Sequence, residues 1–147
     1  MVLVYAESPK GKFKKSAFEA VTYGAKTAQV LGTQCVALTL GDAENAGQLG
    51  QYGASKVVSV SDAALNNFDS QVHAAVIANA AAAVGASVVV VSHSSSGKAL
   101  IGRLAARMDA GSVSAAKEVP TNDGAFKVKT NVFSGNCLLY TSPSPRD

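Results

Sequence analysis

The amino-acid sequence predicts an α/β domain in which helices cover both faces of a mostly parallel β-sheet. Short apolar segments alternate with amphipathic helical segments, the order expected when right-handed crossovers connect parallel strands. Residues 87–91 form the clearest apolar segment, Ser-Val-Val-Val-Val, as in a central strand that is buried on both faces. The 147 residues suffice for one domain with its own core and are too few for two ordinary domains.

The first half of the chain predicts strands and helices in alternation. Buried strands are expected over 2–6, 35–40 and 56–60. Residues 15–31 have helical periodicity, and Gly32 ends this helix because glycine readily adopts the left-handed conformation. The apolar face of the helix consists of Phe18, Val21, Ala25 and Ala28. A short helix over 43–52 is expected before the third strand.

The second half begins with a helix whose N-cap is Asp69, because its carboxylate can accept the free amide hydrogens of the first turn. This helix is expected to end at Gly85 and to lead into the strand over 87–91. A loop over 92–97 precedes a helix over 98–108. The buried face of that helix consists of Leu100, Ile101, Leu104, Ala105 and Met108. The whole order predicts a three-layer, mostly parallel, Rossmann-like fold.

The C-terminal region departs from this alternation. Two strands are expected over 112–119 and 125–133, and the turn signal at 120–124 between them predicts a β-hairpin that extends the sheet. The last residues are rich in proline and small polar residues, which predicts an irregular tail. We therefore divide the chain into a domain over 1–136 and a tail over 137–147 that we expect to be non-native.

The composition excludes several classes of protein. Only 16% of the residues are charged, against roughly 25% in average soluble domains. We therefore expect a partner or another domain to cover part of the surface. The net charge of +3 does not indicate nucleic-acid binding, and the lysine run over 10–15 is expected to be solvated. No apolar run approaches the roughly 20 residues of a membrane span. Two cysteines are too few for a disulfide scaffold and fit a reducing cytoplasm.

The loop after the fourth strand is the predicted site, because ligands of open parallel sheets bind beyond the carboxyl ends of the strands. Its hydroxyl groups and the following helix N-terminus suit an anion or a nucleotide phosphate. The candidate residues are Ser94, Ser95, Ser96 and Gly97. The phosphate-loop pattern fails, since Ser92 replaces the first glycine and Ala99 the magnesium-binding hydroxyl residue. The alternative is that these serines only cap the helix.

The sequence contains no convincing catalytic constellation. His93 could act as a base for a neighbouring serine, as in a hydrolase, but no carboxylate is placed to orient it. Glu7 ends the first strand and is expected to face the same crevice, where it could simply bind loop amides. No pair of cysteines or histidines has the spacing of a metal site. Arg103 and Arg107 lie one helical turn apart and are candidates for pairing with the carboxylates of a partner.

Three segments resemble the electron transfer flavoprotein alpha subunit in their order and spacing. The opening VLVYAES resembles the start of that subunit, and the late KTNVFSGN resembles a strand that ends in a small-Gly-Asn turn. The segment VVVVSHSSSGKALIGRLAARMDAGSVS resembles a strand–loop–helix in which Gly97 opens the helix and Arg103 precedes the run Ala105–Arg107. The resemblance extends from Val2 to about Asn136, and ESPKGKFKK and GASKVVSV resemble the bacterial, Bacteroidetes-like branch.

The resemblance implies the N-terminal domain of an alpha subunit, with a fold of the adenine nucleotide alpha hydrolase-like type, truncated before the domain that binds FAD. The intact heterodimer relays electrons from acyl-CoA dehydrogenases of fatty acid beta-oxidation, and from other dehydrogenases, to a quinone oxidoreductase in the cytoplasm. This domain would be a scaffold that contacts the beta subunit, on which AMP is expected. By the same resemblance, no FAD-binding residue falls within residues 1–136. The subunit would be an electron carrier rather than an enzyme, with no membrane insertion.

An alternative from another class is a stand-alone adenine-nucleotide-binding module that resembles universal stress proteins. Those proteins share the alternation of strands and helices, but they carry a glycine-rich phosphate loop after the fourth strand. The serine-rich loop of this chain, in which Gly97 is the one glycine, fits that pattern poorly.

Overall fold

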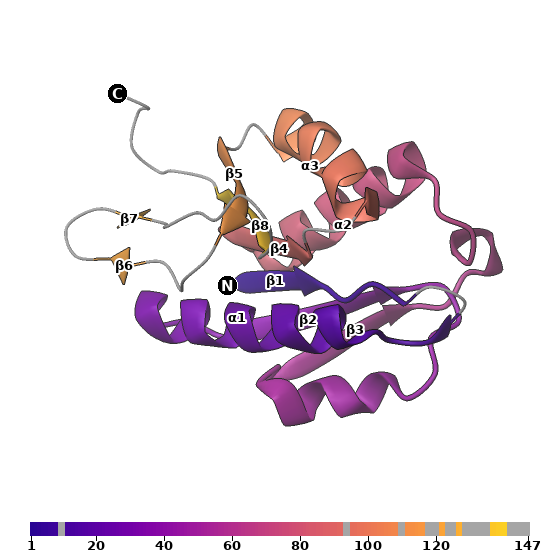
Figure 1. Cartoon of the computed structure of the whole chain (residues 1–147), viewed down its shortest axis with the longest axis horizontal. Helices are drawn as coiled ribbons and strands as arrows, with labels where there is room; N and C mark the ends of the chain where they lie inside the picture. Colours follow the sequence, from indigo (N-terminus) through magenta and orange to yellow (C-terminus); the bar gives the residue numbers. More distant parts are fainter. Residues whose placement is uncertain are drawn as a thin grey trace.

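The computed structural model describes residues 1–8, 11–92, 95–108, 111–116, 121–122, 126–127 and 136–140, with side chains within 1–8, 11–62, 64–92 and 99–108. The strands of the main sheet are β1 (Val2–Tyr5), β2 (Cys35–Leu40), β3 (Lys56–Val60), β4 (Val88–Ser92), β5 (Gly111–Ala116) and β8 (Asn136–Tyr140). They lie in the order β3-β2-β1-β4-β8-β5, as Figure 1 shows in part. The first four strands in this order, from β3 to β4, are parallel to one another, whereas β8 is antiparallel to both β4 and β5.

Helices cover both faces of the sheet, so the predicted three-layer α/β fold is confirmed. Helix α1 (Lys15–Leu31) and the 3-10 helix η2 (Ala46–Tyr52) pack on one face. Helices α2 (Ser70–Val84) and α3 (Ser95–Met108) pack on the other, which is the upper side in Figure 1. No helix in the described part of the chain is long and apolar enough to cross a membrane.

The helix boundaries follow the capping residues. Gly32 and Gly85 end α1 and α2 in the left-handed conformation, with φ of 68° and 69°. At the start of α2, the carboxylate of Asp69 accepts hydrogen bonds from the amides of Gln71 and Val72 at 2.9 and 3.2 Å. The prediction for α3 was wrong at its N-terminus. The helix begins at Ser95 and not at about Lys98, because serine is compatible with the N-terminal end of a helix.

The core has two halves, one on each face of the sheet. Alternate residues of β1 enter different halves, since successive side chains of a strand point to opposite faces. Val2 and Val4 pack with α1, and Leu3 packs with α2 and α3. At Gly24 of α1, an added Cβ atom would overlap Cγ2 of Val4, so this glycine allows the helix backbone to approach the strand closely.

The C-terminal strands pair differently from the prediction. Of the expected hairpin, the strand over 112–119 corresponds to β5 (Gly111–Ala116), which pairs with β8 in the main sheet. Within the expected strand over 125–133 the structure describes β7 (Phe126–Lys127), which pairs in a separate two-stranded sheet with β6 (Thr121–Asn122), inside the expected turn. The main sheet is extended by β8 and β5 instead. The expectation of irregular structure from residue 137 was wrong for residues 137–140, which belong to β8, whereas 141–147 lie outside the described residues. Pairing between strands distant in sequence decided this arrangement, and local patterns do not encode it.

Candidate functional site

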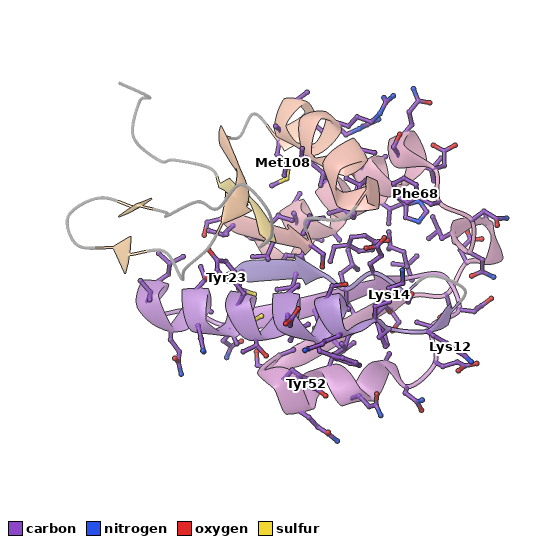
Figure 2. All side chains as sticks on the ribbon, viewed as in Figure 1. Lys12, Lys14, Tyr23, Tyr52, Phe68 and Met108 are labelled. Atoms are coloured by element: carbon purple, nitrogen blue, oxygen red, sulfur yellow. The ribbon has the colours of Figure 1, made fainter. Side chains whose placement is uncertain are left out.

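A small pocket lies at the edge of the sheet where the parallel strands end. Its volume is about 80 Å³. The described residues that line it are Tyr5, Glu7, Ser8, Leu40, Leu65, Asn66, Phe68 and His73. In Figure 2 the labelled Phe68 lies at the same end of the molecule as Lys12 and Lys14, which precede α1. The pocket therefore occupies the edge at which open parallel sheets usually bind ligands.

Four elements contribute these residues. Tyr5 is the last residue of β1, and Leu40 is the last residue of the neighbouring strand β2. Leu65 ends the short 3-10 helix η3 (Ala63–Leu65), which follows β3. His73 lies in the first turns of α2. Because β1, β2 and β3 are parallel, their carboxyl ends meet at one edge and bring these segments into contact.

His73 is held in a fixed position beneath the pocket. Its side chain is 3% exposed, and its Nδ1 lies 3.1 Å from the carbonyl oxygen and 3.3 Å from the amide nitrogen of Asp69. The Phe68 ring lies 5.0 Å from the imidazole ring, and the Tyr5 ring lies 6.4 Å from it in an edge-on arrangement. Phe68 precedes the N-cap and His73 lies in the following turn, as in a hydrophobic staple.

Tyr5 presents a buried hydroxyl group to this region. The residue is 5% exposed, and burial together with the negative charge of Glu7 raises the pKa of Tyr5 well above its usual value. The phenol is therefore neutral at physiological pH. Within the part of the chain that the structure describes, no hydrogen bond is made by its hydroxyl oxygen. Buried hydroxyl groups are nearly always hydrogen-bonded, so this group is suited to a polar ligand or a water molecule.

The rim of the pocket is fixed by hydrogen bonds between two loops. The amide of Asp42 donates to Oδ1 of Asn66 at 2.7 Å, and Nδ2 of Asn66 donates to the Asp42 carboxylate at 3.0 Å. Gly41 has a φ of 87°, and a Cβ atom there would lie 2.6 Å from the same Oδ1 atom. The loop after β2 thus approaches Asn66 at a distance that only glycine permits.

The structure describes the predicted site only in part. Ser94 and His93 lie outside the described residues, and Ser95, Ser96 and Gly97 are placed in the first turn of α3 without described side chains. The predicted anion site therefore stays a prediction. Glu7 lines the pocket between β1, β2 and the start of α2, and its predicted place beside the loop over 92–97 stays a prediction. Arg103 and Arg107 are exposed on α3, away from its buried residues Leu100 and Leu104, as predicted.

The contribution of α2 to the site was not predicted from the sequence. His73 is not among the predicted site residues, although Asp69, four residues earlier, is the predicted helix cap. An aromatic residue before the cap and a histidine in the next turn are the signal that could have placed the imidazole beside Phe68. The neighbouring position of Tyr5 could not be found in this way, because it depends on the packing of α2 on β1.

Comparison with known protein families decides the identity of the domain. The model of the electron transfer flavoprotein domain matches residues 2–146. The chain belongs to this family. No curated protein matches it. Electron transfer flavoproteins are electron carriers rather than catalysts, and they function as heterodimers. The family membership confirms the coarser part of the resemblance seen in the sequence.

The pocket does not fit the flavin of an electron transfer flavoprotein. Sites for ligands of drug size commonly have volumes of about 300–1,000 Å³, and this one has about 80 Å³. Its lining also lacks a described lysine or arginine to bind a pyrophosphate. Among the described residues, no group of three histidine, cysteine or acidic side chains could hold a metal ion. We therefore assign no electron-transfer step to the residues of this pocket.

Proposed function

We propose that this chain is the N-terminal domain of an electron transfer flavoprotein alpha subunit and acts as a scaffold for the beta subunit. The observation that carries the proposal is the family match over residues 2–146. The alpha assignment is supported by the opening VLVYAES and by Arg103 before the run Ala105–Arg107. The complete heterodimer would carry electrons from acyl-CoA and other dehydrogenases to a quinone oxidoreductase in the bacterial cytoplasm.

The same proposal assigns FAD to another domain of the complete protein and AMP to the beta subunit. The support is the size of the pocket at the sheet edge, which has room for a small head group and not for a nucleotide. In this assignment the domain contributes shape and contact surface to the complex, and the redox chemistry belongs to the flavin bound elsewhere.

Calorimetric titration of the purified chain tests this assignment. We expect no binding of FAD, AMP or ATP with a Kd below about 100 μM, since the described pocket lacks both the volume and the cations for a nucleotide. The matched reference is an intact alpha–beta heterodimer, which should bind FAD under the same conditions. Micromolar binding of ATP by the chain would favour the module related to universal stress proteins. Micromolar binding of FAD would contradict the placement of the flavin in another domain.

The outer face of α3 is the surface that we assign to the beta subunit. Arg103 and Arg107 are exposed there one turn apart, and the exposed residues Gly102 and Ala106 beside them are small. Small residues allow a partner backbone to come close, and two guanidinium groups can then form paired hydrogen bonds with carboxylates. The opposite face of the sheet carries α1, so the two helices offer separate surfaces for comparison (Figure 1).

Reversing the charge of this surface should weaken the heterodimer. The double variant Arg103→Glu/Arg107→Glu is expected to lower affinity for an electron transfer flavoprotein beta subunit by at least about tenfold, since two contacts to carboxylates become repulsive. Surface plasmon resonance with immobilised beta subunit measures the change. The control is Lys15→Glu/Lys26→Glu on α1, which makes the same change of charge at exposed positions. Equal losses in both variants would show that net charge, and not the α3 surface, governs the association.

A further inference from the structure

Strand β3 forms one edge of the main sheet, at the opposite end of the strand order from β5 (Figure 1). It pairs with β2 on one side, and no strand in the described part of the chain pairs with its other side. The carbonyl of Val60 accepts a hydrogen bond from the amide of Gly41 at 2.8 Å, so it faces β2. Because the main-chain groups of successive strand residues point alternately to the two sides, the amides and carbonyls of Val57 and Ser59 point to the free edge.

This free edge is regular and partly apolar. The register between β3 and β2 is continuous from Lys56 to Val60, without a bulge, and no proline lies in residues 53–68. Val58 and Val60 are half-buried on the face of the sheet that carries α2, and Val57 is half-buried on the face that carries α1. A strand added at this edge would therefore remove further valine surface from water on both faces.

The charged side chains along this edge are symmetric about Ser59. Over residues 45–68 the chain has only two charged side chains, Lys56 and Asp62, and both are exposed. Helix η2, which packs beside β3, is uncharged, and α1 with the lysines at its start packs on β1, β2 and β4. Among the described residues the Lys56 ammonium makes no ion pair, and the Asp62 carboxylate accepts a hydrogen bond from the Ala64 amide only. Both groups can therefore take an opposite charge from outside the chain.

A second copy of β3 complements these charges in one antiparallel register. If Ser59 lies opposite Ser59 of the second copy, Lys56 lies opposite Asp62 of that copy, because both are three residues from Ser59. The two-fold axis then forms the same pair a second time. A shift of two residues, the smallest that keeps the outward main-chain groups opposite each other, places Lys56 opposite Val60 or Ala64. Opposite charges on facing residues stabilise antiparallel strands, so the charges select the first register.

We propose that β3 pairs in antiparallel orientation with β3 of a second copy of this chain, with Ser59 on the two-fold axis and Lys56 paired with Asp62 across it. The outward amides and carbonyls of both strands then bond to each other, and Val58 of each copy lies beside Val60 of the other. The same surface serves both copies, so the assembly closes as a dimer. The proposal does not depend on the alpha-subunit assignment or on the α3 surface.

Sedimentation equilibrium of the purified chain tests the pairing. We expect the average mass to rise from that of one chain towards that of two chains between about 10 μM and about 1 mM, as for a small and weak interface, and to rise no further. A chain that stays monomeric over this range would overturn the proposal, and Lys56 would then be a charge that protects an unpaired edge. Masses beyond two chains would also contradict it, because they indicate open-ended association of unlike edges.

Charge reversal tests the register. Lys56→Glu places a carboxylate opposite Asp62 at both pairs, and Asp62→Lys places an ammonium opposite Lys56, so either variant alone should associate at least about tenfold more weakly. An equimolar mixture of the two variants should recover the affinity, because two pairs of opposite charge form again between unlike chains. The control is Lys26→Glu, which makes the same change of net charge at an exposed position of α1 and should associate like the unchanged chain.

Recovery in the mixture separates pairing from a structural effect of either substitution, since damage to each fold would not be repaired by mixing. Circular dichroism confirms that each variant is folded. A mixture of folded variants that associates no better than either variant alone would contradict the pairing of Lys56 with Asp62. An equal loss in Lys26→Glu would show that net charge, and not the edge of β3, governs the association.

Discussion

The thiol of Cys35 is expected to react with iodoacetamide at pH 8 about a hundredfold more slowly in the folded protein than in the urea-unfolded chain. The residue lies on β2 in the core half that faces α1 and is 3% exposed. Burial raises the pKa of the Cys35 thiol from 9.0 to about 11. Because the thiolate is the nucleophile, this rise in pKa alone lowers the reactive fraction about a hundredfold at pH 8.

Peptide mass mapping after timed alkylation measures the rate at Cys35 separately from that at Cys137, the other cysteine of the chain. N-acetylcysteine in the same reaction provides the rate of an unprotected thiol. A rate at Cys35 that is the same with and without urea would show that the face of the sheet under α1 is open to reagents. The buried core described for β1, β2 and α1 would then be wrong.

Substitution of two helical glycines by alanine should change stability in opposite directions. Gly24→Ala is expected to lower the free energy of unfolding by about 1–3 kcal/mol, because its Cβ atom would overlap Val4 and force α1 away from β1. Gly102→Ala should raise it by about 0.5–1 kcal/mol, because no atom lies within 4 Å of the added Cβ and alanine favours the helix. Urea denaturation followed by circular dichroism measures both changes.

The two glycine variants control for each other. Both replace a helical glycine by alanine, so both gain the same intrinsic helix propensity. Only the space around the Cβ atom differs between them. Stabilisation by both substitutions would mean that propensity outweighs packing at Gly24, and that the contact between α1 and β1 is looser than described.

Much of the fold could be predicted where local residues determine it. The boundaries of α1 agree with the prediction because Gly32 takes the left-handed conformation at its end. Those of α2 follow from the Asp69 cap and Gly85 in the same way. The strands β1, β2 and β4 are recognisable in the sequence because they are buried on both faces. These signals all lie within a few residues of the structure that they specify.

The rest depends on contacts between distant segments. The sequence predicts a tail at the apolar residues of β8, because a proline-bearing sequence follows them and nothing nearby shows that β4 is their partner. The pocket was missed for the same reason. Its residues come from β1, β2, η3 and the start of α2, and the parallel sheet brings these segments together only after folding. Glu7 could be predicted as a candidate residue because the strand that precedes it is recognisable from the neighbouring residues alone.

The position of β8 has a consequence for synthesis of the protein on the ribosome. Its residues pair with β4 from Val88↔Tyr140 to Ser92↔Asn136. The edge of β4 that β8 covers therefore has no partner strand until residue 140 has been synthesised. At translation rates of about 5–20 residues per second, the interval after Ser92 lasts roughly 2–10 s. During that time the valine-rich edge of β4 is available for pairing with another nascent chain. We therefore expect chaperone dependence to be greatest for nascent chains that end between β4 and β8.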